Sequence, residues 1–498
     1  MTHHLRGAAA LALWLCVLPL AASDDLESSV KHITEAYAIL EDNAADAVSP
    51  EDAFFKGAIP GMLHRLDPHS VFFDAGQFEQ LKKLETSTEK GFGSVVSVLP
   101  GRVIVLQTLP GTPSAKSGMS PGDEILAING YQLSRLDFEQ LVQLLSESRQ
   151  RQAQLTVRRP GNARFLNFVL TPEEMQSPSV DRAFLLKPGL GYVRVNSFDE
   201  KTPRQIKEAI ENLGGGGLKG LVLDLRNNPG GLLNSALDTA SLFLKPGAKL
   251  VTVRGRNVPE KSETAVAHTT PYEFPMAVLV NGKSASGSEI VSGALQDHDR
   301  AAIIGESSFG KGLVQSIFPL SGGAGLALTT ALYYTPSGRS IQKPLDAQRF
   351  ALAAATAHPN GQSEFRTDAG RRVTGGGGIV PDYVVYPAGQ TRLEAVLDAS
   401  GSFTTFATDY VRAHKVTGEF EVTPALLDDF QQFLVQHDIQ PSVAEWSAER
   451  DFVESRLKQE IINQSLGVEK GDEVEARRDP QVLKALEVIG ASRVAASN

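Results

Sequence analysis

Apolar and polar positions along the chain follow two different periods, and each period predicts a different kind of element. Between residues 24 and 88, apolar side chains recur three and four positions apart, as at Val30, Ile33 and Tyr37, which predicts helices. From residue 89 to 172, short β-rich runs alternate with turns that contain glycine and proline. The period changes near residue 88, where we expect a domain boundary.

The β-rich stretch predicts four strands and one helix. The strands are Ser94–Leu99, Val103–Thr108, Glu124–Ile128 and Gln154–Arg158, and the helix is Leu136–Leu145. A polar segment that contains proline, residues 172–182, follows and predicts a linker.

From residue 180 to about 390, strands and helices alternate. The predicted strands are Leu190–Val195, Leu221–Leu225, Ala277–Val280 and Ala301–Gly305, and the predicted helices are Pro203–Leu213 with Thr202 as N-cap, Leu232–Phe243 and one that begins near Ser288. Such alternation favours a mostly parallel sheet covered by helices. Reactive groups in these sheets gather where strands end and helices begin.

Residues 391–498 again have the helical period. Thr423-Pro424 supplies an N-cap and a first-turn proline, and Leu426, Phe430 and Leu434 form one apolar face, which predicts core or interface packing. The tail after Lys470 is highly charged, and we expect it to fray. The fold class is therefore multidomain α/β, with a mostly parallel core sheet, a preceding β-rich domain and helical flanks at both ends.

The first 23 residues are typical of a secretory signal peptide. Arg6 precedes an apolar run, Ala8–Leu20, and small residues follow it. The alternative is a retained membrane anchor, for which the run is short. The one cysteine, Cys16, lies in this segment, so a processed chain has no disulfide and no thiol chemistry. We expect export to the periplasm or cell envelope, with membrane association if the signal stays uncleaved.

Composition narrows the classes of function. Of 498 residues, 42% are hydrophobic, which excludes a disordered chain and a polytopic membrane protein. Lys and Arg number 48 against 58 Asp and Glu, a net charge of −10 that disfavours nucleic acid as a partner.

Two common chemistries fit the motifs poorly. Gly305–Lys311 resembles the start of a phosphate-binding loop, but Gly312 stands where such a loop needs a hydroxyl for its metal. Asp297-His298-Asp299 has no fourth ligand to make a metal site, and the sequence has no His-Glu-x-x-His. We therefore expect no metal and no cofactor. A Ser-His-Asp triad stays open, because the chain has 10 histidines, although none lies in a Gly-rich turn.

One pair of loops is more specific. Small residues from Asn281 to Ser288 follow a predicted strand and open a helix, where backbone amides face an incoming anion. Lys311, between two glycines and apolar neighbours, follows the next predicted strand. Adjacent parallel strands would bring the loops together, and a desolvated lysine can act as a neutral base.

These loops resemble a known family. Ser284-Ala285-Ser286-Gly287-Ser288-Glu289-Ile290, together with Phe309-Gly310-Lys311-Gly312-Leu313-Val314-Gln315, looks like the signature of the C-terminal processing, or tail-specific, serine proteases. The segments Leu221–Gly231, Tyr333–Gln342 and Gly375–Asp382 also match. The resemblance implies a Ser-Lys dyad peptidase on an α/β core, here residues 180–390.

The resemblance also implies roles for single residues. Ser286 falls on the nucleophile, Lys311 on the general base and Gln315 on the residue that orients the lysine, while Asp297 falls on an acid sometimes assigned to a charge relay. The oxyanion donors would be Gly230 or Gly231, and Gly287, where the family usually has alanine.

The β-rich stretch contains Gly111-Thr112-Pro113-Ser114-Ala115, Gly122-Asp123-Glu124-Ile125 and Ile128-Asn129-Gly130. This run resembles the central part of a PDZ domain, which residues 89–172 would form. Gly91-Phe92-Gly93-Ser94 is similar to its carboxylate-binding loop, although Ser94 stands where an apolar residue is usual. Such a domain binds a peptide tail as an added β-strand. The alternative is an internal β-module without a ligand. The N-terminal Leu66-Asp67-Pro68-His69-Ser70 also resembles a family segment, without an implied role in catalysis.

We therefore predict an exported endopeptidase whose partners are protein or peptide substrates with free C-terminal tails. The alternative is a noncatalytic PDZ adaptor that retains the core as a scaffold. A protease that stays inactive until it is triggered is also open. The helical flanks at both ends favour a homo-oligomer.

Overall fold

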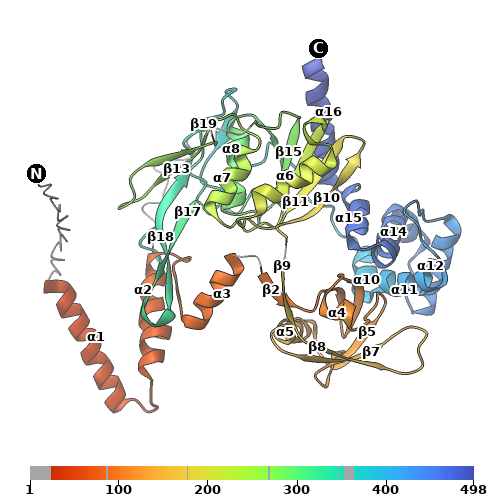
Figure 1. Cartoon of the computed structure of the whole chain (residues 1–498), viewed down its shortest axis with the longest axis horizontal. Helices are drawn as coiled ribbons and strands as arrows, with labels where there is room; N and C mark the ends of the chain where they lie inside the picture. The colour runs from red at the N-terminus through yellow and green to blue at the C-terminus, as the bar shows by residue number, and fades with distance from the viewer. Residues whose placement is uncertain are drawn as a thin grey trace, which may run out of the picture. The chain divides into compact units, whose positions relative to one another are not determined.

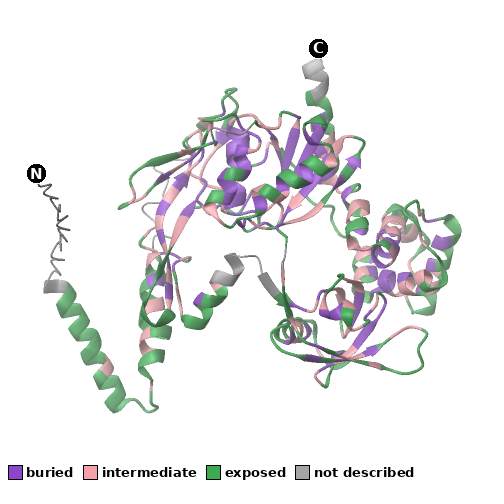
Figure 2. Ribbon diagram, in the orientation of Figure 1, coloured by how far each residue is buried: buried purple, intermediate pink, exposed green. Residues whose placement is uncertain are grey.

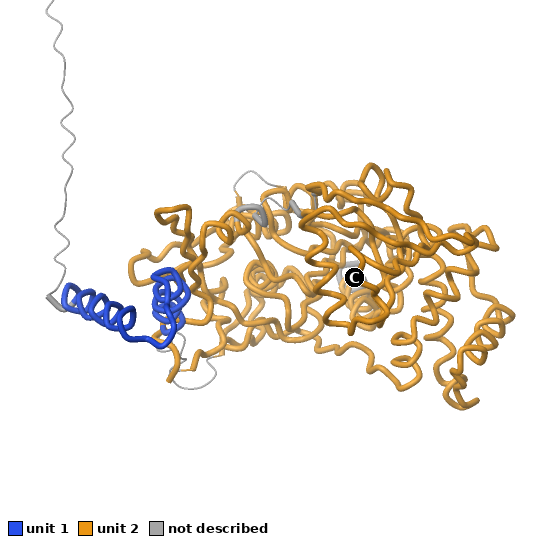
Figure 3. Tube along the Cα trace, turned by 90° about the horizontal axis from the view of Figure 1, so that it is seen from below, with its two compact units in different colours: residues 1–65 blue, residues 66–498 orange. Residues whose placement is uncertain are grey.

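The computed structural model describes residues 24–85, 88–176, 178–266, 270–346, 348–352 and 364–497. The predicted signal peptide, residues 1–23, lies outside this part of the chain. The chain divides into two compact units, residues 1–65 and 66–498 (Figure 3). Among the described helices, none is both long and apolar enough to cross a membrane.

The first unit is helical, as the apolar period predicts. It holds α1 (Asp24–Asn43), the π-helical segment η1 (Glu51–Ala58) and most of α2 (Ile59–Leu66). Tyr37 packs against Phe54 with ring centroids 5.0 Å apart. The predicted stripe on α1 stays exposed, with Val30 at 55% and Ile33 at 51%, and Figure 2 shows the helix exposed along nearly all of its length.

The next segment departs from the helical prediction for residues 24–88. Pro68 ends the helical period, and β1 (Val71–Phe73) then pairs antiparallel with β18 (Gly325–Tyr334) before α3 (Ala75–Glu85) begins. The β-branched and aromatic side chains of Val71, Phe72 and Phe73 favour a strand once an edge is available. The second unit thus begins with a strand of its own.

The β-rich domain contains the four strands and the helix that the short apolar runs predict, as well as elements that they do not predict. Its elements follow one another in chain order. They are β2 (Thr88–Gly91), β3 (Ser94–Leu99), β4 (Arg102–Thr108), α4 (Pro113–Lys116), β5 (Glu124–Ile128), β6 (Tyr131–Gln132), η2 (Leu133–Arg135), α5 (Phe138–Ser148), β7 (Ala153–Arg158) and β8 (Leu166–Leu170). The sheet order is β3-β4-β5-β7-β8, with β6 paired to β5, so β3 is an edge strand. The predicted linker is partly wrong, because β9 (Glu173–Gln176) pairs with β2.

The core is a mostly parallel sheet, as predicted. Its strands are β10 (Val180–Lys187), β11 (Leu190–Val195), β12 (Gly220–Asp224), β15 (Met276–Val280), β16 (Ala302–Gly305) and β21 (Tyr383–Val384), in that order across the sheet. Only the β10–β11 pair is antiparallel. The carboxyl ends of β12, β15 and β16 therefore lie side by side at one edge. Figure 1 marks β11 and β15 of this sheet.

Helices cover both faces of this sheet. The helices of one face are α6 (Thr202–Leu213), α7 (Leu233–Ser241) and α8 (Gly287–Asp297). The short helix η3 (Gly215–Gly217) follows α6. Every residue of α8 is buried, as Figure 2 shows. The other face packs on the C-terminal α16 (Pro480–Ser497), whose Val482, Ala485 and Ile489 meet Val222 and Leu279.

A second, antiparallel sheet borders the core. It comprises β1, β18, β13 (Lys249–Arg254) and β14 (Lys261–Thr264), and β17 (Leu313–Pro319) also pairs with β18. The short η4 (Ser321–Gly323) connects β17 and β18. A separate hairpin is formed by β19 (Glu364–Arg366) and β20 (Arg372–Thr374).

The C-terminal region folds into further helices. They are α10 (Arg392–Ser400), α11 (Ser402–Ala413), α12 (Pro424–Gln436), α13 (Val443–Ala448), α14 (Arg450–Leu466), α15 (Val468–Ala476) and α16. The predicted stripe on α12 is core, with Phe430 and Leu434 fully buried. Fraying after Lys470 is wrong for the described tail, because α16 completes the hydrophobic cover of the core sheet.

Candidate active site

Ser286 lies at the junction between β15 and α8, where the backbone is strained. Its φ of 51° and ψ of −109° place a non-glycine residue in a region that L-residues avoid. Its amide donates to Glu289 Oε2 at 2.9 Å, and its carbonyl accepts from the Tyr333 hydroxyl at 3.1 Å. These contacts stabilise the turn that places Ser286 directly before Gly287, the first residue of α8.

Lys311 lies between β16 and β17 and is half-buried. Its Nζ donates to Gln315 Oε1 at 2.7 Å, and Gln315 Nε2 donates to the carbonyl of His69. Burial lowers the pKa of the Lys311 ammonium below its ordinary value, although the carboxylates of Asp67 and Glu289 act in the opposite direction. The site therefore favours the neutral amine more than water does.

Ser286 and Lys311 open into the same pocket, which has a volume of about 480 Å³. Gln315, Gly231 and Gly287 also line it. Much of the remaining wall is apolar, with Leu81, Phe198, Leu232, Leu233, Ile290, Leu313, Val314 and Ile317. Parallel pairing of β15 with β16 brings the two loops together, as the strand-end argument predicts.

A buried carboxylate joins the two loops. Glu289 is 0% exposed and accepts from Ser286 N, Lys311 N, Gly310 N and Ser308 Oγ, at 2.9, 2.9, 2.7 and 2.5 Å. Burial raises the pKa of this carboxyl, whereas the four hydrogen bonds favour its ionised form. Sequence reasoning gave Glu289 no role, although Ser286 and Glu289 have the Ser-x-x-Glu spacing of a capping box.

Tyr333 is a second bridge between the loops. Its hydroxyl lies 2.7 Å from the Lys311 carbonyl and 3.1 Å from the Ser286 carbonyl. The side chain is almost completely buried, and burial raises the pKa of the phenol well above its ordinary value. The hydroxyl therefore stays protonated and remains a donor. The sequence linked the segment Tyr333–Gln342 to the family only by resemblance and predicted no role for Tyr333 itself.

The glycine turn after β12 packs against the serine loop. A Cβ on Gly230 would lie 2.8 Å from Gly287 N, and one on Gly231 would lie 2.1 Å from the carbonyl oxygen of Phe198, so neither position accepts a side chain. Gly230 N donates to Asn228 Oδ1 at 2.8 Å, inside the turn. Gly231 and Gly287 line the pocket with Ser286.

Asp297 lies at the far end of α8 from Ser286. Its carboxylate accepts from Arg339 Nη2 at 2.7 Å and from Ser337 N at 2.9 Å. Asp297 is 2% exposed and Arg339 is 0% exposed, so the two form a buried ion pair. These contacts hold the segment around Ser337 against α8 and do not include Ser286 or Lys311.

The loop Gly91-Phe92-Gly93-Ser94 leads directly into the edge strand β3. Gly93 has φ +74°, and a Cβ there would lie 2.2 Å from Thr112 Cβ, so the turn requires glycine. The carbonyls of Phe92 and Gly93 accept from Ser114 N and Leu109 N at 2.9 and 2.8 Å. The loop is thus tied to the segment that follows β4.

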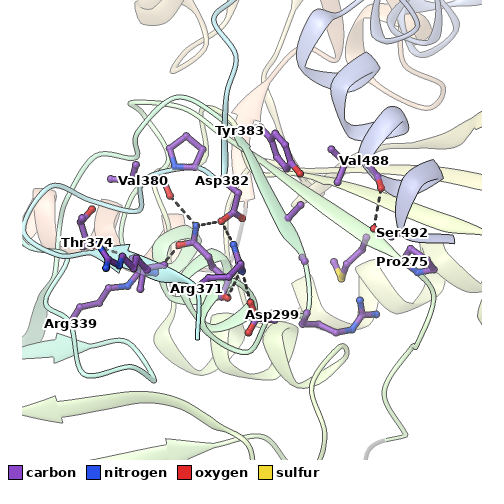
Figure 4. A pocket seen from close by; sticks show the side chains of 18 of the residues that line it. Pro275, Asp299, Arg339, Arg371, Thr374, Val380, Asp382, Tyr383, Val488 and Ser492 are labelled. Atoms are coloured by element: carbon purple, nitrogen blue, oxygen red, sulfur yellow. Dashed lines mark hydrogen bonds and ion pairs between the residues drawn. The ribbon is translucent and has the colours of Figure 1, made fainter. Parts of the chain in front are cut away.

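A larger pocket, of about 830 Å³, lies away from these loops beside α16 (Figure 4). Arg371 occupies its centre and bonds both Asp299 and Asp382, and Gln296 Nε2 donates to Asp382 Oδ1 at 3.0 Å. Arg371 is thus paired with carboxylates on two sides, and neither Ser286 nor Lys311 lines this pocket. The smaller pocket is therefore the candidate active site.

Parts of the chain are similar in sequence to known proteins. The sequence profile of Peptidase family S41 matches residues 189–347, and that of the PDZ domain matches residues 104–159. A carboxy-terminal-processing protease of Bartonella bacilliformis is 41% identical over 303 residues, which are 59% of this chain and 68% of that protein. The carboxy-terminal processing protease CtpB of Bacillus subtilis is 30% identical over 326 residues, 65% of this chain and 67% of its own length.

Among solved structures, a photosystem II D1 C-terminal processing protease is 27% identical and covers 72% of this chain and 87% of its own, with a TM-score of 0.41. By the two sequence profiles, the β-rich domain is a PDZ domain, and the core is that of Peptidase family S41. The chain belongs to the carboxy-terminal-processing proteases, which are serine peptidases.

Proposed function

We propose that this peptidase cleaves by a Ser286–Lys311 dyad. The observation that carries the proposal is that both side chains open into one pocket, where burial favours the neutral Lys311 amine. Lys311 donates an N–H to Gln315 Oε1, which leaves the nitrogen lone pair for the Ser286 hydroxyl proton.

The reaction follows from these positions. Neutral Lys311 takes the proton of Ser286, and the alkoxide attacks the scissile carbonyl. The amides of Gly231 and Gly287 stabilise the oxyanion, because the Gly230 amide already donates to Asn228. The Lys311 ammonium then protonates the leaving amine, and the neutral amine activates water for deacylation. Asp297 has no step in this scheme, since its carboxylate is occupied by Arg339 and Ser337.

The dyad predicts how activity depends on pH. The base is the neutral amine, so kcat/KM rises as the pH rises through the pKa of Lys311. Burial lowers that pKa below the ordinary value of 10.5, and the midpoint of the rising limb is expected below that value. The measurement is kcat/KM for a peptide substrate across the pH range. An optimum in acid, with activity falling toward neutral pH, would point to carboxylate chemistry.

We further propose that the PDZ domain captures the free C-terminal tail of the substrate. β3 is an edge strand, so an extended tail can pair with it, and the Gly91–Ser94 loop at its start is positioned for the terminal carboxylate. Phe138 and Val142 are exposed one turn apart on α5, at 55% and 45%, and offer contacts for apolar tail side chains. Export by the N-terminal segment, to the periplasm or cell envelope, belongs to the same proposal.

The test of tail capture compares a peptide with a free carboxylate and its amidated twin. We expect the amidated peptide to have a KM about tenfold higher or more, because the loop loses a charged acceptor. Val142→Asp is expected to raise KM for the free peptide with little change in kcat. The matched control is Val169→Asp, which places the same charge at an exposed valine of β8, the opposite edge strand. Equal kinetics for both peptides, or equal effects of both substitutions, would contradict the proposal.

A further inference from the structure

The turn Asp67–Ser70, at the start of the second unit, is built around a buried carboxylate. Asp67 is 0% exposed. Its Oδ1 accepts from His69 N at 2.7 Å and Ser70 N at 2.9 Å, and its Oδ2 accepts from Ser70 Oγ at 2.6 Å. These three bonds determine the direction of the His69 carbonyl, because they fix the peptide planes on both sides of that residue.

The turn is anchored on the sheet that carries Gln315. Thr329 N on β18 donates to Ser70 Oγ at 3.1 Å, and β1 continues the attachment with Val71 opposite Ala327. Gln315 on β17 lies opposite the same Thr329 in the β17–β18 register. The turn and Gln315 thus have a common neighbour on β18.

The His69 carbonyl decides which way the Gln315 amide faces. A primary amide has one acceptor and one donor end, and Nε2 of Gln315 is held by His69 O. Oε1 is therefore directed at Lys311 Nζ, 2.7 Å away. With the amide reversed, its NH₂ group would face the Lys311 amine and compete with Ser286 for the lone pair.

Charge around Lys311 also comes from this turn. The groups that face Lys311 are Asp67 and His69 of the turn, Glu289 of α8 and the Tyr333 hydroxyl of β18. The negative charge of Asp67 raises the pKa of Lys311 and so opposes the effect of burial. Burial lowers the pKa of the half-buried His69, and the positive charge of Lys311 lowers it further.

We propose that the Asp67–Ser70 turn is a positioning element of the catalytic site, in which Asp67 holds the His69 carbonyl so that Gln315 aims Lys311 at Ser286. The inference rests on the proposed dyad. The turn thereby contributes to catalysis, although no side chain of the turn has to touch the substrate. Asp67 is a positioning residue in this scheme.

A double-mutant cycle tests the positioning role. Asp67→Ala is expected to lower kcat by about 10- to 100-fold with KM changed by less than about threefold, because small errors in base placement are costly. In a Gln315→Ala background, the same substitution is expected to cost less than about threefold, since its effect passes through Gln315. Losses that multiply fully in the double variant would overturn the proposal. If Asp67→Ala does not fold, as judged by circular dichroism, Ser70→Ala takes its place in the cycle.

The conservative variant adds a readout that a structural role would not move. Asp67→Asn keeps a side-chain oxygen for the two backbone amides but removes the charge, so kcat is expected to stay above that of Asp67→Ala while the midpoint of the pH profile moves down. The matched control is Asp74→Asn, because exposed Asp74 also accepts from a backbone amide, Gln77 N at 2.8 Å. We expect its midpoint to be unchanged. Wild-type kcat and midpoint in both Asp67 variants would overturn the proposal.

Lys311→Ala separates this inference from the proposed function. An active Lys311→Ala variant contradicts the dyad itself. An inactive Lys311→Ala variant beside fully active Asp67 variants leaves the dyad standing and rejects the role of the turn alone.

Discussion

Replacing Lys311 or Ser286 with alanine is expected to abolish peptide cleavage while leaving the fold intact. Each substitution removes one half of the proposed acyl-transfer chemistry, and we expect kcat to fall by about 1,000-fold or more. Both positions are partly exposed at a pocket, so truncation to alanine leaves the hydrophobic core unchanged. The measurement is single-turnover cleavage of a free-tail peptide, with thermal unfolding as the check on folding.

Lys283→Ala is the matched control for the lysine. Lys283 lies three residues before Ser286 in the same loop but is exposed, and it does not line the active-site pocket. Its removal is expected to change kcat by less than about twofold. Robust cleavage by Lys311→Ala would show that another group acts as the base. Because His69 lies in the field of Lys311, it would then be the first alternative to examine.

Glu289→Gln is expected to have the second largest effect. The carboxylate accepts four hydrogen bonds, and a glutamine would turn its NH₂ group toward at least one pair of donors. Each buried donor left without an acceptor costs about 1–3 kcal/mol. We expect a lower melting temperature and a fall in kcat of about 100-fold, since the backbones of Ser286 and Lys311 lose their common anchor.

Glu394→Gln separates a bridging role from ordinary helix capping. Glu394 occupies the same position in the capping box of α10, where its Oε2 accepts from Thr391 N at 2.9 Å, but it is partly exposed and distant in sequence from the dyad. This control is expected to change kcat by less than about twofold. Near-normal kcat in Glu289→Gln would mean that the two loops keep their geometry without the carboxylate.

Local patterns predicted most of the elements that carry the site. β3, β5 and β11 have the predicted bounds, because alternating or continuous apolar runs between Gly and Pro turns leave few other choices. The N-terminal prediction missed β1, and the linker prediction missed β9, because each strand is short and forms only where a distant partner supplies an edge. The charged tail was expected to fray, yet its apolar positions cover a face of the core sheet that local sequence does not reveal.

By itself, the sequence located the two loops, since Ser286 and Lys311 follow predicted strand ends, and its resemblance to the C-terminal processing proteases predicted the class of protein. Only the tertiary structure decided how those loops are held. Glu289 and Tyr333 bridge them, and the Asp67–Ser70 turn reaches Gln315 across 246 positions of sequence. Most of these bonds end on backbone atoms that every residue carries, so apart from the Ser-x-x-Glu spacing of Ser286 and Glu289 the residue pattern does not reveal them. They form only after long-range strand pairing has placed donors and acceptors within about 3 Å of each other.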